Sequence, residues 1–195
     1  MIIEGLLTTE TPDGRVHVAP MGPVVNVDLT QWILRPFQTS TTFQLLRRSS
    51  VAVFHVIDDV VPVVQSALGL PIELDFQRLT SGGWLIQQAC HWYQLEVYEW
   101  DLTSQRSQAI ARVTEHGTLR PFWGWNRAKH AVLEGAIMAT RLHLIGTEQV
   151  REELSRWQPM IDKTAGDRER YAWELIHRYI QSQIDGTGLL AEKGS

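Results

Sequence analysis

The sequence predicts an α+β protein in which a mainly β, antiparallel core is followed by about three helices. Three observations support this prediction: apolar and β-branched runs fill the first half of the chain, two long alternating runs follow, and helical periodicity replaces alternation after Gly117. Hydrophobic residues make up 44% of the 195 positions and charged residues 21%. This composition is that of a globular protein and excludes a disordered chain or a coiled coil.

The N-terminal segment is predicted to be a β-hairpin. Residues 2–9 and the run that begins at 15–18 are apolar and β-branched, and Thr11-Pro12-Asp13-Gly14 between them has turn chemistry. Further strands are expected over residues 24–29, 32–34 and 51–57. Short helices are expected over residues 43–48 and 60–68.

The middle of the chain predicts a long antiparallel strand pair. Residues 90–100 and 107–114 alternate in polarity, and the link between them is polar. In the first run, alternation places the even-numbered residues from Trp92 to Trp100 on one face and His91, Tyr93, Leu95 and Val97 on the other.

Helices are expected over residues 126–144, 147–163 and 168–184. Thr147 is the predicted N-cap of the second helix. Small residues form a stripe on the first of these helices: Ala128, Ala131, Gly135 and Ala139. Apolar residues form a stripe on the third: Tyr171, Leu175, Tyr179 and Ile180. A composition change near Trp125 divides the chain into a β domain, residues 1–125, and a helical region, residues 126–185.

Several functional classes have no support in the sequence. The net charge of -4 argues against nucleic-acid binding, which depends on Lys and Arg at phosphates. No leader pattern is present and no apolar run approaches the ~20 residues of a membrane span, so we expect a cytoplasmic protein without a membrane partner. The P-loop, dinucleotide, zincin and hydrolase motifs are absent, and seven scattered histidines predict no metal site. His55 is interpreted as a hydrogen-bonded residue within a strand.

The strongest candidate site is an anion site in residues 34–43. Four consecutive hydroxyl residues (Thr39, Ser40, Thr41 and Thr42) precede a predicted helix, whose first backbone N–H groups have no intrahelical acceptor. Arg35 adds a permanently charged, planar set of donors, and Phe37 adds a flat ring. Together these groups suit a phosphate or carboxylate. The alternative is an ordinary helix N-cap without a ligand.

Two further candidates leave alternatives open. Arg127 and Lys129 lie at a helix start, where cations oppose the helix dipole; they indicate either an anionic partner or a solvated face paired with acids such as Asp58 or Asp59. In Ala19-Pro20-Met21-Gly22, proline and glycine end strand pairing and expose peptide groups that suit a planar heteroaromatic ring. A plain strand exit is the alternative there. No catalytic residue is singled out.

In their order along the chain, these segments resemble the flavin-reductase-like FMN-binding split barrel. The matching segments are Asp13-Gly14, His17 to Gly22, Arg35-Pro36-Phe37, Ser40-Thr41-Thr42, Leu45-Leu46 and Val51 to Asp58. Residues 89–97 and 126–134 are similar to one branch of this superfamily, a domain-of-unknown-function family with a helical C-terminal region. The likeness spans roughly residues 1–179.

The resemblance implies a six-stranded antiparallel split barrel, a homodimer and FMN near the dimer interface. It assigns the flavin phosphate to Arg35, Thr39, Ser40, Thr41 and Thr42 and the flavin ring to the backbone of Ala19, Pro20, Met21 and Gly22. Arg127 and Lys129 are assigned a phosphate contact in the same or the neighbouring subunit. The implied activity is electron transfer from NAD(P)H through FMN to a small acceptor. The alternatives are a flavin carrier or sensor, an FMN-dependent enzyme of pterin or one-carbon metabolism, and a cofactor-free dimerisation module.

Overall fold

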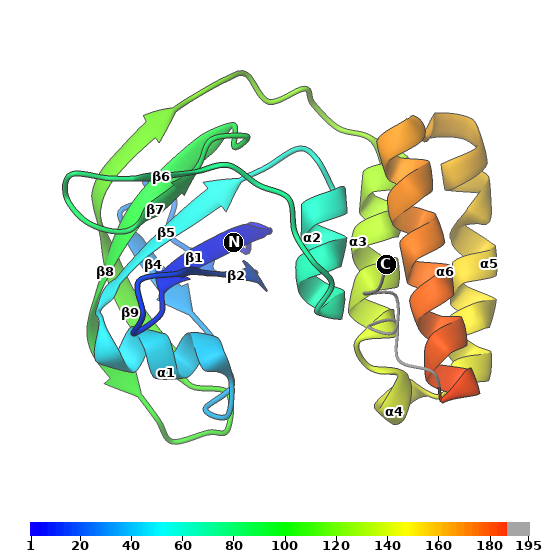
Figure 1. Cartoon of the computed structure of the whole chain (residues 1–195), viewed down its shortest axis with the longest axis horizontal. Coiled ribbons are helices and arrows are strands. Elements are labelled where there is room, and N and C mark those ends of the chain that lie inside the picture. The colour runs from blue at the N-terminus through cyan, green and yellow to red at the C-terminus, as the bar shows by residue number, and fades with distance from the viewer. Residues whose placement is uncertain (187–195) are drawn as a thin grey trace. The chain divides into compact units, whose positions relative to one another are not determined.

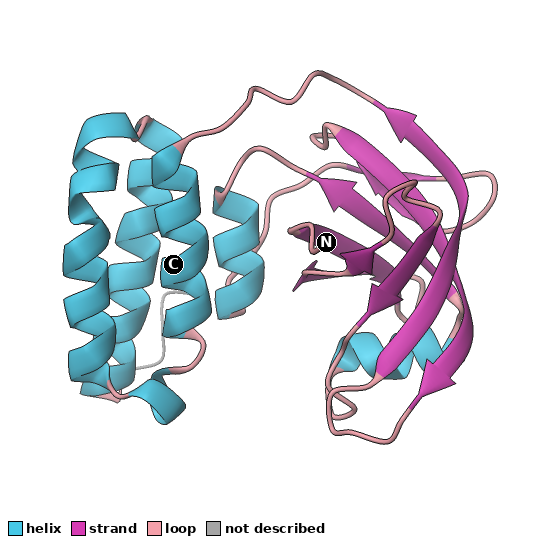
Figure 2. Ribbon diagram, turned by 180° about the vertical axis from the view of Figure 1, so that it is seen from behind, coloured by secondary structure: helices cyan, strands magenta, loops and turns pink. Residues whose placement is uncertain are grey.

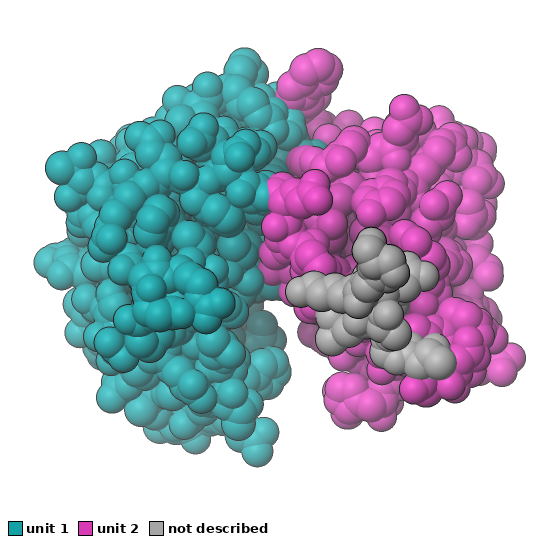
Figure 3. All heavy atoms as spheres, in the orientation of Figure 1, with its two compact units in different colours: residues 1–58, 74–122 teal, residues 59–73, 123–195 magenta. Residues whose placement is uncertain are grey.

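The computed structural model describes residues 1–186, which form two compact units (Figure 3). The β unit contains Met1–Asp58 and Leu74–Phe122, and the helical unit contains Asp59–Glu73 and the described residues from Trp123 onward. The predicted division near Trp125 therefore differs from the structure at residues 59–73. This segment joins the helical unit because Val61, Val64 and Leu68 share a core with the later helices.

The β unit is built on a seven-stranded antiparallel sheet that curls on itself (Figures 1 and 2). Its spatial order is β2-β1-β5-β8-β9-β4-β3. The strands are β1 (Gly5–Glu10), β2 (Val16–Met21), β3 (Val24–Val25), β4 (Gln31–Leu34), β5 (Val51–Val56), β8 (His91–Asp101) and β9 (Gln108–Thr118). The predicted α+β class and antiparallel core are confirmed. The expected count of six strands is wrong, and the sheet includes the two-residue strand β3, which pairs with β4 at one edge.

The inner face of the curled sheet holds the main core of this unit. Trp32 and Phe54 are fully buried there, with ring centroids 5.0 Å apart. Helix α1 (Thr41–Arg48) lies at one end of the sheet (Figures 1 and 2) and contributes Leu46 to this core. Burial of such large apolar side chains is the principal stabilising term of the unit.

The outer face carries a small hairpin that the sequence did not predict. It consists of β6 (Phe76–Arg78) and β7 (Trp84–Ile86). The Thr8 hydroxyl donates to the Trp84 carbonyl at 2.5 Å, and Leu85 packs against Val53 and Trp92. Strands of three residues give too short an alternation to be recognised.

The predicted pairing of β8 with β9 is confirmed, and the predicted faces of β8 hold from Trp92 to Val97: Leu95 and Val97 lie in the main core, and Trp92 packs on the outer face with the hairpin. Register shifts occur between Gln94 and Leu95 and between Val97 and Glu99. A β-bulge places an extra residue in one strand and turns the following side chains to the other face. The second shift leaves Tyr98 with no residue opposite it on β9, and Trp100 consequently packs against the main core instead of sharing the face of Trp92.

The helical unit contains α2 (Val61–Leu68), α3 (Arg127–Ala139), α4 (Leu142–Ile145), α5 (Thr147–Thr164) and α6 (Asp167–Asp185). The small-residue stripe on α3 is buried as predicted. Thr147 does not cap α5, because Gly146 occupies the N-cap position. On α6 the predicted apolar stripe is partly wrong, because Trp173 is buried and Tyr171 is exposed. The buried face of α6 is therefore rotated relative to the predicted one.

Two negative findings apply to residues 1–186. No helix in this part of the chain is long and apolar enough to cross a membrane. Nor do three or more His, Cys, Asp or Glu side chains gather there as ligands for a metal ion.

Candidate functional site

The run of hydroxyl residues forms the start of α1, and its members have different roles. Ser40 is the N-cap: its Oγ accepts the Phe43 N–H at 3.2 Å and donates to the Phe37 carbonyl at 2.7 Å. Both hydrogen-bonding functions of the Ser40 hydroxyl are therefore used within the chain. Thr39 and Thr41 are exposed, so their hydroxyls face solvent.

Thr42 is directed to the sheet instead. Its side chain is 5% exposed, and Oγ1 lies 3.0 Å from Nε2 of His17 on β2. Burial lowers the pKa of His17 below its usual value, so the ring is neutral at neutral pH. The contact joins two sequence-predicted segments, the hydroxyl run and the strand that leads to Ala19.

Arg35 contains an unusual buried donor. Its Nε is buried and has no hydrogen-bond partner among the described residues. The backbone around it is well held, because the Arg35 carbonyl accepts the Nε–H of Arg106 at 3.1 Å. The Pro36 carbonyl accepts both the N–H and the hydroxyl of Ser107. A guanidinium N–H buried without an acceptor is costly, and an anionic oxygen would remove that cost.

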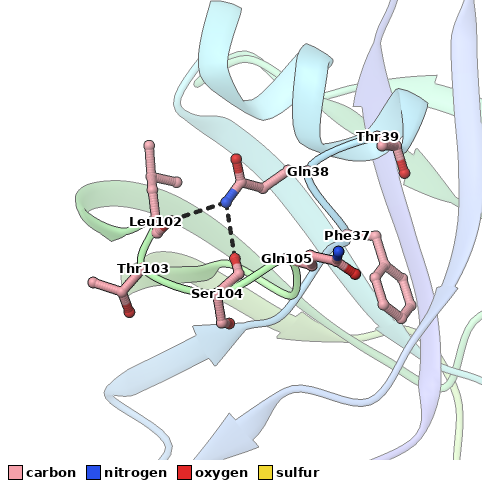
Figure 4. Close-up of a pocket in the computed structure, with 7 residues that line it drawn as sticks. All are labelled: Phe37, Gln38, Thr39, Leu102, Thr103, Ser104 and Gln105. Atoms are coloured by element: carbon pink, nitrogen blue, oxygen red, sulfur yellow. Dashed lines mark hydrogen bonds between the residues drawn. The ribbon is translucent and has the colours of Figure 1, made fainter.

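A pocket of about 440 Å³ opens beside the hydroxyl run (Figure 4). Phe37, Gln38 and Thr39 form one wall, and residues 102–105 of the β8–β9 link form the other. The Gln38 amide points to the opposite wall and donates to the carbonyls of Leu102 and Ser104 at 3.0 and 2.8 Å (Figure 4). The guanidinium of Arg106 lies over the Phe37 ring, 5.5 Å from its centroid.

The predicted ring-contacting segment lies at the end of β2, an edge strand of the sheet. β2 pairs with β1 on one side only, which leaves its other backbone edge without a strand partner in the sheet. Met21 is buried in the main core, so its side chain serves packing. Pro20 is exposed, and Ala19 and Gly22 are partly buried.

The two basic candidates belong to the helical unit, at the start of α3. Lys129 Nζ lies 4.0 Å from Oε1 of Glu169 on α6, and Arg127 is exposed. The acids suggested as partners for them bind other residues. Asp58 pairs with Arg120, and Asp59 pairs with Arg168. The anionic group next to Lys129 is thus the Glu169 carboxylate. The phosphate contacts of Arg127 and Lys129 stay predictions.

Sequence reasoning missed two parts of this region. The link residues 102–105 were interpreted only as a polar connection, and no motif in them indicates a pocket wall. His17 begins one of the segments that carry the family resemblance, but its hydrogen bond to Thr42 depends on how β2 and α1 come together in space.

Comparisons with solved structures define the class of fold. An FMN-bound protein from Methanosarcina mazei, itself assigned to the DUF447 family, has a TM-score of 0.78 at 24% identity, over 91% of this chain and 94% of that one. Flavin reductase HpaC, complexed with NADP+, has a TM-score of 0.55 at 12% identity, over 63% and 81% of the two chains. An FMN-binding protein from Thermus thermophilus with bound 1-cyclohex-2-enone has a TM-score of 0.51 at 12% identity, over 60% and 70%. The fold is therefore of the flavin-reductase split-barrel type.

Family models give the more specific assignment. The model described as the N-terminal domain of a protein of unknown function (DUF447) matches residues 3–120, and a second DUF447 model matches residues 126–178. The chain belongs to the DUF447 family, and the family resemblance drawn from the sequence is confirmed. No curated protein matches the chain.

Proposed function

We propose that this chain is an FMN-binding oxidoreductase of the flavin-reductase type, which passes electrons from NAD(P)H to a small acceptor. The observation that carries the proposal is the buried Nε of Arg35, which has no hydrogen-bond partner within residues 1–186 and lies in the segment that leads into the hydroxyl run. An anionic phosphate oxygen fits that donor. The FMN-bound relative from Methanosarcina mazei and the NADP+ complex of HpaC support the cofactor and the electron donor, respectively.

The proposed phosphate site combines three kinds of donor. Arg35 supplies charge, Thr39 and Thr41 supply exposed hydroxyls, and the first turn of α1 supplies backbone N–H groups. Ser40 serves this site as the cap that holds the turn, and Thr42 serves it through its bond to His17. A hydrogen bond that involves a charged group contributes about 1.5–3 kcal/mol.

The proposed ring site is the backbone edge of β2 at Ala19, Pro20, Met21 and Gly22, together with the exposed ring of Phe37. Backbone carbonyls and N–H groups at a sheet edge present hydrogen-bonding positions in one plane, which suits a planar heteroaromatic ring. When bound, FMN supplies the redox chemistry itself, so the chain needs no general base. The protein's part is to bind the cofactor, orient it and leave one face of the ring accessible.

We further propose that the functional form is a homodimer, with the small redox substrate binding close to the flavin. β2 is an edge strand with no strand neighbour on one side, and proteins normally cover or pair such an edge. A second copy of the chain is the partner that the split-barrel fold implies. Light scattering of the purified protein tests this proposal by its mass, which is expected to be twice that of one chain.

The deciding experiment is spectroscopy of the purified, full-length chain. Bound oxidised FMN gives a yellow protein whose released small molecule has the mass of FMN, and anaerobic NADH or NADPH bleaches the flavin absorption. A protein that is colourless and also fails to bind added FMN refutes the proposal and leaves a dimerisation module. A yellow protein that neither nucleotide bleaches points to a flavin carrier or to a different reductant.

A variant pair tests the phosphate assignment. Arg35→Ala is expected to raise the FMN Kd by about tenfold to a hundredfold, the range set by one charge-assisted hydrogen bond. Arg48→Ala removes the same charge from the exposed last turn of α1 and is expected to leave the Kd unchanged. Equal effects of the two substitutions would show that general electrostatics, and not the Arg35 site, holds the cofactor.

A further inference from the structure

A hydrogen bond between the side chains of His17 and Thr42 links the two halves of the proposed flavin site. His17 is in β2, whose end is the proposed ring edge, and Thr42 is in the first turn of α1, the proposed phosphate site. Nε2 and Oγ1 lie 3.0 Å apart, within normal hydrogen-bonding distance. The inference below rests on the proposed function.

The register of the sheet explains why His17 can reach α1. His17 pairs with Thr9 of β1, and two residues further along β2, Ala19 pairs with Leu7. Residues directly opposite each other in an antiparallel pair lie on the same face, so His17 and Thr9 face the inner side with Leu7, which is part of the main core. Helix α1 contributes Leu46 to this same core.

A polar side chain on this inner face does not always have a hydrogen-bond partner. The neighbouring Thr9 is 3% exposed, and its Oγ1 has no hydrogen-bond partner among the described residues. Thr42 is buried to a similar degree, but His17 satisfies its hydroxyl. An unpaired buried hydroxyl costs about 1–3 kcal/mol. Without the His17 ring, the Thr42 hydroxyl would have to form a different hydrogen bond, and α1 would turn away from its present orientation.

We propose that His17 is a positioning residue for the flavin phosphate: by holding Thr42, it fixes the first turn of α1 so that the hydroxyls of Thr39 and Thr41 and the turn's N–H groups converge on the phosphate. His17 itself does not touch the cofactor in this arrangement. Arg35, whose buried Nε has no partner in the part of the chain that the structure describes, supplies the charge independently of His17.

The test compares two flavins that differ only in the phosphate. FMN and riboflavin are titrated against the full-length protein by flavin fluorescence quenching, for the wild type, His17→Leu, His17→Gln and Thr9→Val. His17→Leu is expected to weaken FMN binding by about tenfold while riboflavin binding changes little, because one ordering hydrogen bond is lost. His17→Gln keeps a hydrogen-bonding group and restores most of the FMN preference. Thr9→Val, on the same inner face, leaves it unchanged.

A second route removes the same hydrogen bond from the other partner. Thr42→Val is expected to lower the FMN preference as His17→Leu does, and the double variant is expected to be no worse than either single one, because both remove one shared interaction. This arm decides the question if His17→Leu fails to fold. If the variants keep the wild-type ratio of FMN to riboflavin affinity, His17 has no positioning role. If the wild type binds neither flavin, the proposed function itself is refuted.

Discussion

The backbone N–H of Ile86 donates to Nε2 of His55 across 3.0 Å, and this bond ties the β6–β7 hairpin to the centre of the sheet. The other ring nitrogen, Nδ1, lies 3.2 Å from the Leu6 carbonyl. Because Nε2 must accept, the proton is on Nδ1, which donates to Leu6. One neutral histidine therefore joins β5 to β1 and to β7, and the prediction that His55 is a hydrogen-bonded strand residue is confirmed.

This arrangement predicts acid sensitivity. Burial lowers the pKa of His55 from 6.5 to about 4 in the folded state. Above pH 6.5 the His55 ring is neutral in both the folded and the unfolded chain, so its full contribution to the free energy of unfolding is present. As the pH falls toward 4, only the unfolded chain takes up the proton, and this contribution is lost. We expect a loss of about 3 kcal/mol over that window, since one pKa unit corresponds to about 1.4 kcal/mol. Urea unfolding at several pH values measures it.

His55→Gln is the control for this prediction, because an amide also donates and accepts but does not titrate. The variant is expected to be less stable than the wild type at pH 7 and to lose less stability between pH 6.5 and pH 4. Parallel stability curves for the two proteins would show that another group causes the acid sensitivity.

Gly5 is predicted to tolerate no side chain. A Cβ at this position would lie 2.2 Å from the His55 carbonyl oxygen and 2.6 Å from the Phe54 ring. Neither a central strand nor a buried ring can move away, so Gly5→Ala is expected to destabilise the protein by about 1–3 kcal/mol, the usual cost of overpacking. At Gly22 the atoms nearest to an added Cβ belong to the Glu4 carboxylate, which ends an exposed, flexible side chain. Thermal melts that show equal losses for Gly5→Ala and Gly22→Ala would contradict this account.

Cys90 is predicted to be unreactive in the folded protein. The side chain is fully buried, and burial together with the nearby Asp58 carboxylate raises the pKa of its thiol. Since the thiolate is the reactive species, Ellman's reagent is expected to react slowly with the native protein and to detect the one thiol promptly in urea. Cys90→Ala provides the blank. Rapid reaction of the native protein would mean that this part of the sheet opens readily.

Locally encoded features of the fold were predictable from the sequence. The turn at residues 11–14 sets the β1–β2 hairpin through its own chemistry, and long alternation identified β8 and β9. The β6–β7 hairpin was not predictable, because its position depends on Thr8 and His55, which lie far away in the sequence. The burial of Gln94 was not predictable for the same reason, since its amide donates to the Gly82 carbonyl at the tip of that hairpin.

The candidate site shows the same limit. The hydroxyl run identified the start of α1, because capping chemistry is local. Which hydroxyls remain available was not predictable: Ser40 is used by the cap, and Thr42 is used by His17. The pocket wall at residues 102–105 arises only when the β8–β9 link folds against Gln38.

Ser40 caps α1 and also lies in the proposed phosphate site, and substitutions can separate its effect on stability from its effect on FMN binding. Ser40→Ala is expected to lower stability by about 1 kcal/mol, since it removes the N-cap. Ser40→Asn and Ser40→Asp both retain a capping oxygen and are expected to keep near wild-type stability.

Only Ser40→Asp adds a negative charge, and like charges about 5 Å apart repel by about 3 kcal/mol near a protein surface. It is therefore expected to weaken FMN binding by about tenfold or more without affecting riboflavin. Melting curves and flavin titrations test both parts, and equal FMN affinities for the two variants would place the phosphate elsewhere.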